Sequence, residues 1–136
     1  MPEERTERSS IVDAIRSYLE ARPEILFAYL HGSFEEGGPY RDVDVAVWLD
    51  PARASSGAWY QYALNLSLAL QTAVKETVDV QVLNGAPLAV RYHALRGKAI
   101  LVRDWDLLDD VRARTWDDYF DFLPFARQYL REALSA

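Results

Sequence analysis

Apolar positions along the chain switch between helical spacing and short continuous runs, and this pattern predicts an ordered series of helices and strands. A first helix is predicted over residues 9–22, with Ser9-Ser10 as its cap and Pro23 ending it. The apolar run from Ile25 to His31 lacks polar alternation and predicts a strand buried on both faces, which Gly32 ends.

The middle of the chain continues the alternation. Val43 to Leu49 predicts a second strand, and residues 56–75 predict a helix. Val78 to Leu83 predicts a third strand, followed by a turn at Asn84-Gly85. The predicted helix carries one apolar stripe, formed by Trp59, Tyr62, Leu66 and Leu70. Such a stripe is typical of a helix that packs on a core.

The last third of the chain predicts a short helix from Pro87 to Leu95, a strand from Lys98 to Val102, and a helix from Trp105 onward. Pro124 predicts a break or kink in that last helix. The order αββαβαβα predicts an α/β (α+β) fold, in which helices pack on a small mixed sheet of about four strands.

Length and composition narrow the class of protein. With 136 residues, half of them apolar, we expect a single domain over residues 1–136. The net charge of −6 does not favour an extended nucleic-acid groove, because such binding depends on neutralising phosphates. There is no cysteine, no secretion signal and no apolar run long enough to span a membrane, so we expect a cytoplasmic protein.

Candidate chemistry gathers around the first two strands. Asp42 and Asp44 stand two residues apart, so in a strand they point to the same side. Two adjacent carboxylates repel each other unless a cation lies between them, and hard oxygen ligands favour Mg²⁺. Gly32 lets the backbone approach a phosphate closely, and Ser33 can donate its hydroxyl and its backbone N–H. Together these residues predict nucleotide chemistry.

Asp79 adds a third carboxylate near the start of the third predicted strand. If that strand lies beside the second, Asp42, Asp44 and Asp79 meet, and two Mg²⁺ ions about 4 Å apart would suit in-line phosphoryl transfer. Asp42 and Asp44 would ligate both ions. Asp79 would ligate the ion on the side of the attacking hydroxyl and assist its deprotonation.

These motifs resemble the polymerase-β-like nucleotidyltransferase superfamily. The resemblance rests on Gly32-Ser33-Phe34, on Asp42-Val43-Asp44-Val45 and on Val78-Asp79-Val80, which match a Gly-Ser turn, an Asp-x-Asp strand and a third Asp on a later strand. More narrowly, the chain looks like the minimal nucleotidyltransferases. The likeness covers a core of about residues 11–103, and the aromatic segment within residues 105–136 looks like their C-terminal helix.

The resemblance implies Mg²⁺-dependent transfer of a nucleoside monophosphate, commonly AMP from ATP, to an acceptor hydroxyl with release of pyrophosphate. It also implies an antitoxin role toward a small helical HEPN ribonuclease toxin, which some members AMPylate on tyrosine. Two features depart from the family pattern: Arg41 replaces the Ser that often precedes the first Asp, and the loop between Gly32 and Asp42 is short. Arg41 could contact a phosphate instead, or could be a surface residue.

Other readings of these residues stay open. The chain could be a non-catalytic antitoxin that neutralises its partner by occlusion, or a small-molecule nucleotidyltransferase in which a homodimer supplies the missing wall. His31 is more simply a packed residue at a strand end than a phosphate ligand, and His93 is assigned no role. The aromatic C-terminal residues default to core packing, with a partner surface as the alternative. Further candidates for triphosphate contacts are Lys75, Arg91 and Lys98.

Overall fold

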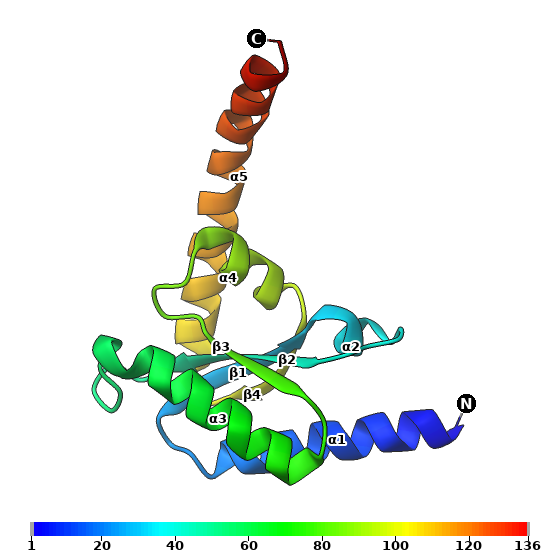
Figure 1. The fold of residues 1–136 in the computed structure, drawn as a ribbon. Coiled ribbons are helices and arrows are strands. Elements are labelled where there is room, and N and C mark those ends of the chain that lie inside the picture. Colours follow the sequence, from blue (N-terminus) through cyan, green and yellow to red (C-terminus); the bar gives the residue numbers. More distant parts are fainter. Residues whose placement is uncertain (1, 136) are drawn as a thin grey trace.

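The computed structural model describes the backbone of residues 2–135 and the side chains of residues 6–135. Helices and strands alternate along this range (Figure 1). In chain order they are α1 (Pro2–Glu20), β1 (Ile25–His31), α2 (Gly32–Glu36), β2 (Val43–Leu49), the 3-10 turn η1 (Ser56–Ala58), α3 (Trp59–Val74), β3 (Val78–Val82), α4 (Leu88–Leu95), β4 (Lys98–Val102) and α5 (Trp105–Ser135). Within residues 2–135, no helix combines the length and apolar character that a membrane crossing needs.

The strands form one mixed sheet in the order β3-β2-β1-β4. β1 runs antiparallel to β2 and to β4, whereas β2 and β3 are parallel. Helices α1 and α3 cover one face, and α4 with the first turns of α5 covers the other (Figure 1). The predicted α/β fold, with its small mixed sheet and packed helices, is therefore confirmed.

The sheet divides the interior into two apolar clusters because its strands alternate. Val43, Val45 and Val47 of β2 pack toward α1 and α3, while Ala46 packs toward α4 and α5. Asp44 belongs to the same side of β2 as Ala46, so its carboxylate lies on the α4 side of the sheet. The alternation predicted for this strand thus sets the direction of its acidic side chain.

Three sequence predictions about where helices begin or end are wrong. α1 begins at Pro2, so Ser9-Ser10 lies inside the helix rather than capping it; proline is well suited to a first helical position. The Gly32-Ser33 turn expected after β1 instead begins the short helix α2, which ends at Gly37 in a left-handed conformation. α5 runs on through Pro124, so the break that the sequence offered as one of two outcomes does not occur. The carbonyl freed there belongs to an exposed turn, where water can satisfy it.

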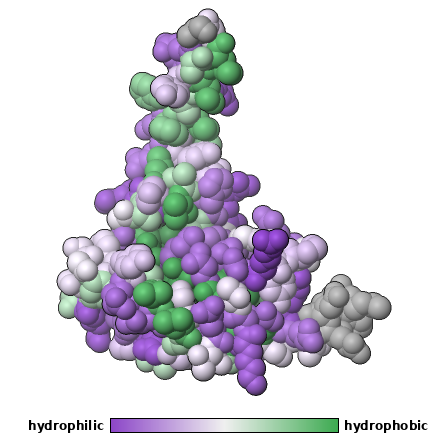
Figure 2. Space-filling model, in the orientation of Figure 1, coloured by the Kyte–Doolittle hydropathy of each residue, from purple (hydrophilic) through white to green (hydrophobic). Residues whose placement is uncertain are grey.

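The second half of α5 projects from the body of the molecule, and apolar side chains line this projection (Figures 1 and 2). The Tyr119 ring stacks on Tyr92 of α4, with ring centroids 3.6 Å apart. Beyond it, Phe122, Phe125 and Tyr129 are 52%, 76% and 72% exposed. Core packing, the default expectation for the aromatic segment, is therefore wrong for Phe120, which is 55% exposed, and for Phe122 and Phe125.

Two arginines fasten the C-terminal half of α1 to the sheet, and Arg16 does so by donating from Nε to the carbonyl of Ile100 in β4, at 3.0 Å. Arg103, directly after β4, donates hydrogen bonds to the backbone carbonyls of Leu19, Glu20, Arg22 and Ile25. A cation at a helix C-terminus also complements the helix dipole. This contact fixes α1 against both β1 and β4.

Candidate active site

Gly32 and Ser33 lie where β1 passes directly into α2. Gly32 has φ +78°, which glycine adopts without strain. A Cβ atom at this position would lie 2.3 Å from Oδ2 of Asp44. The turn and the carboxylate therefore occupy adjoining space that only glycine leaves free, although the sequence suggested glycine only for its approach to phosphate.

The parallel pairing of β2 with β3 brings two of the predicted aspartates side by side. Asp44 and Asp79 are register partners, and Asp42 immediately precedes β2. Asp44 is half-buried, whereas Asp42 and Asp79 are exposed. Among the described side chains, however, no three His, Asp or Glu residues already converge as a complete metal site.

The surroundings of Asp44 disfavour its charged form. Its pKa is raised, first by burial and then by the neighbouring carboxylates of Asp79 and Asp42. A cation would relieve this repulsion, and a set of carboxylate oxygens matches the preference of Mg²⁺. The donor set therefore fits Mg²⁺ chemically.

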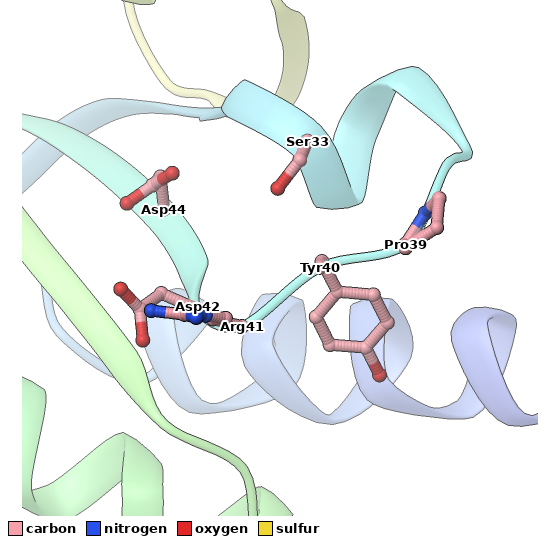
Figure 3. A pocket seen from close by; sticks show the side chains of 6 residues that line it. All are labelled: Ser33, Pro39, Tyr40, Arg41, Asp42 and Asp44. Carbon is pink, nitrogen blue, oxygen red and sulfur yellow. The ribbon is translucent and has the colours of Figure 1, made fainter.

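A cleft of about 390 Å³ opens beside Asp42 and Asp44 (Figure 3). The Ser33 hydroxyl points toward the space between α2 and these carboxylates (Figure 3). Arg41 also lines the cleft, as the candidate phosphate contact nearest to the aspartates in sequence. Lys75, Arg91 and Lys98 do not line it; Lys75 instead caps the C-terminus of α3.

Arg8 holds the segment that borders this cleft, a role that sequence analysis missed. Its guanidinium donates to the carbonyls of Phe34, at 2.9 Å, and Gly38, at 2.7 Å. It also lies over the rings of Phe34 and Tyr40, 5.2 Å and 4.8 Å from their centroids. The contact joins α1 to the loop before Asp42. No sequence motif points to it, because it links residues far apart in the chain.

His31 lies beside the aspartates, as the register partner of Asp44 across the antiparallel pair. Burial is the main cause that lowers its pKa; the Asp79 carboxylate opposes this effect and His93 adds to it. Its Nε2 atom is buried and makes no hydrogen bond to the described residues. The packed strand-end residue expected from the sequence is therefore also close enough to sense Asp79.

Comparison with known families decides the classification. A family model described as "Polymerase beta, Nucleotidyltransferase" matches residues 13–106. The chain belongs to this family. The match spans β1 to β4 of the nucleotidyltransferase fold and contains all three aspartates, so the family resemblance is confirmed. No curated protein matches the chain significantly by sequence.

Solved structures resemble this nucleotidyltransferase over nearly its whole length. A crystal structure of a toxin–antitoxin with AMP-PNP aligns with 22% identity and a TM-score of 0.70, covering 92% of this chain and 98% of the other. A tri-AMPylated Shewanella oneidensis HEPN toxin in complex with MNT antitoxin gives 21% identity, a TM-score of 0.63, and coverages of 97% and 98%. The toxin–antitoxin MntA-HepT gives 19%, 0.63, 97% and 99%. At these identities the likeness establishes the shared fold.

Proposed function

We propose that this nucleotidyltransferase transfers AMP from ATP to a hydroxyl of a protein partner and releases pyrophosphate. The observation that carries the proposal is the pairing of Asp44 with Asp79 beside the turn at Gly32 and Ser33. Structures of the same fold include one with AMP-PNP and one with an AMPylated toxin, which supports ATP as donor and a protein as acceptor.

The residues of the cleft suit the triphosphate of ATP and the Mg²⁺ that accompanies it. Ser33, with its backbone N–H, would hold the terminal phosphates, and Arg41 would balance their charge. Asp42, Asp44 and Asp79 would hold Mg²⁺, with two ions expected for a site of this class. Bound there, Mg²⁺ supplies charge neutralisation for the phosphates and lowers the pKa of the acceptor hydroxyl.

The transfer itself exchanges one P–O bond for another. The acceptor oxygen forms a bond to the α-phosphorus of ATP, and the bond from that phosphorus to the bridging oxygen of the β-phosphate breaks. Pyrophosphate leaves with the electron pair, on the side held by Ser33. Asp79 takes up the hydroxyl proton as the new bond forms.

The partner in this proposal is a small helical protein of the HEPN type, for which the chain acts as antitoxin in the cytoplasm. The exposed aromatic face of α5 supports a protein partner, because Phe125 and Tyr129 contribute apolar surface that nothing within the described residues covers. Structures of the same fold in toxin–antitoxin complexes support the class of partner.

Labelled ATP, Mg²⁺ and a small helical protein of the HEPN type provide the test. We expect label on the partner, and a loss of at least about 100-fold in transfer when Asp42 and Asp44 are both changed to Ala. The control is Asp50→Ala, at the opposite end of β2 and outside the cleft. Absence of label, or label transferred equally well by the double variant, would overturn the proposed activity.

Occlusion of the partner without chemistry is the second candidate, and the exposed apolar face of α5 favours it. The same double alanine variant separates the two. If the variant still protects cells from the partner as well as the unchanged chain does, occlusion is sufficient. If protection is lost while partner binding persists, the transfer is required.

A further inference from the structure

A second cleft adjoins Asp79 on the side away from Ser33, and we propose that it binds the acceptor polypeptide through an apolar side chain next to the reactive hydroxyl. This inference rests on the proposed function and adds the acceptor surface to it. The groove has a volume of about 520 Å³ and follows β3 from Asp79 past Gln81. Its walls come from α3, from β3 and from the segment that leads into α4, elements that Figure 1 labels.

The in-line geometry of the transfer indicates that this groove receives the acceptor. In an in-line displacement the attacking and leaving oxygens lie on opposite sides of the phosphorus. If pyrophosphate departs on the Ser33 side, the acceptor must enter from the Asp79 side. Asp79 lines this groove and its register partner Asp44 lines the cleft of Ser33, so the paired strands β2 and β3 contribute one aspartate to each cleft.

The chemistry of the walls identifies the acceptor class. Trp59, Leu64 and Val90 give the groove an apolar lining, and Asp79 is the one charged residue among the described residues that line it. A nucleic-acid acceptor would require cations here, because phosphate contacts dominate its binding. A polycationic acceptor would require several carboxylates. An apolar stretch of polypeptide next to the reactive hydroxyl fits a groove that has neither the cations for a nucleic acid nor the carboxylates for a polycation.

The groove is already shaped in the chain alone. Asn84 is buried, and its amide both accepts from the backbone N–H of Leu49, at 2.8 Å, and donates to the carbonyl of the same residue, at 2.9 Å. This contact fixes the turn after β3. At Gly85 a Cβ would lie 3.1 Å from the Trp59 ring, so the turn packs closely on the groove wall. A preformed site pays less ordering entropy on binding.

The groove offers pockets for side chains rather than a free strand edge. The Ser67 hydroxyl accepts a hydrogen bond from the backbone N–H of Val80 at 3.0 Å, on the outer edge of β3. A bound segment therefore cannot pair with that N–H without displacing Ser67. Recognition by side-chain burial, beside the Asp79 carboxylate, follows from this arrangement.

Three synthetic peptides test the proposal. Each carries one central tyrosine, flanked by Leu and Val, by Lys, or by Glu, and each is incubated with the full chain, labelled ATP and Mg²⁺. We expect the apolar peptide to be labelled at least tenfold faster than either charged peptide. Leu64→Lys should lower kcat/KM for the apolar peptide at least tenfold and leave the Kd for ATP within twofold of its original value.

Leu68→Lys is the matched control, because Leu68 lies one turn further along α3, is 56% exposed and does not line the groove, whereas Leu64 is 45% exposed. This variant should label the apolar peptide at the original rate. ATP binding without labelling of any peptide, preference for a charged peptide, or equal effects of the two variants would overturn the groove proposal alone. Failure of the unchanged chain to bind ATP would overturn the proposed function itself.

Discussion

Gly32 and Asp44 lie so close together that there is no room for a side chain at position 32. A Cβ on Gly32 would lie 2.3 Å from Oδ2 of Asp44. The turn that is proposed to hold phosphate and the carboxylate that is proposed to hold metal are thus built against each other. A change to one position moves the other.

Gly32→Ala should therefore impair catalysis more than folding. We expect it to destabilise the chain by about 1–2 kcal/mol, because alanine must adopt a positive φ, and to lower AMP transfer at least tenfold by displacing Asp44. Gly37→Ala is the control: it carries the same strain at φ +91° with nothing within 4 Å. Urea denaturation and label transfer measure the two effects. Equal activity in both variants would contradict the prediction.

Asp44→Asn should stabilise the chain at neutral pH. The raised pKa of Asp44 means that the unfolded chain loses this proton first, so stability falls as the pH rises above its ordinary value of 3.8. Removing the charge should raise the Tm by about 3 °C at pH 7, equivalent to about 1 kcal/mol. The gain should shrink as the pH is lowered toward 4.

Mg²⁺ binding provides a second comparison between the unchanged chain and Asp44→Asn. Mg²⁺ should raise the Tm of the unchanged chain more than that of Asp44→Asn, because a ligand stabilises the folded state that binds it. Calorimetry at pH 7 with and without millimolar Mg²⁺ measures both. A destabilised Asp44→Asn variant, or equal Mg²⁺ effects, would count against a repulsive cluster that a cation relieves.

Asn84→Ala should cost about 2–4 kcal/mol of folding free energy, because it leaves the buried N–H and carbonyl of Leu49 without partners. Asn65→Ala is the comparison, since Asn65 is exposed and accepts only from Gln61, and should change stability by less than about 0.5 kcal/mol. Chemical denaturation followed by circular dichroism distinguishes them. Similar losses in the two variants would show that the Asn84 contacts are not decisive.

Phe125→Glu combined with Tyr129→Glu should weaken binding of the helical partner at least tenfold. Both side chains are largely exposed, so the free energy of unfolding of the isolated chain should change by less than about 0.5 kcal/mol. Arg127→Glu, which places a carboxylate on the opposite, exposed side of α5, should leave binding unchanged. Isothermal titration calorimetry with the partner decides, and undiminished binding by the double variant would place the interface elsewhere.

Hydrophobic spacing predicted the sheet well because each strand is a short apolar run between turn residues. Lys98 to Val102 was predicted with its observed limits, and Val78 to Val82 within one residue. Helix ends were harder. α2 is held partly by Arg8, whose contacts to Phe34 and Gly38 cross about 30 residues of sequence, and local propensity contains no such information.

The composition of the candidate site was readable from the sequence, but its arrangement was not. Residue types and spacing pointed to Asp42, Asp44 and Asp79, yet their proximity depended on β3 lying parallel to β2, which the sequence posed only as a condition. The groove beyond Asp79 was missed altogether. Its walls come from α3, β3 and the turn at Asn84, and only the folded chain brings them together.

The Arg103 contact implies an order of events during synthesis. α1 emerges first from the ribosome, but the guanidinium that binds the carbonyls at its end belongs to a residue made three-quarters of the way through the chain. β1, likewise, lacks its neighbour β4 until then. The nascent chain can therefore bind the C-terminal end of α1 through Arg103 only after β4 has emerged, by which time every candidate metal ligand has already been translated.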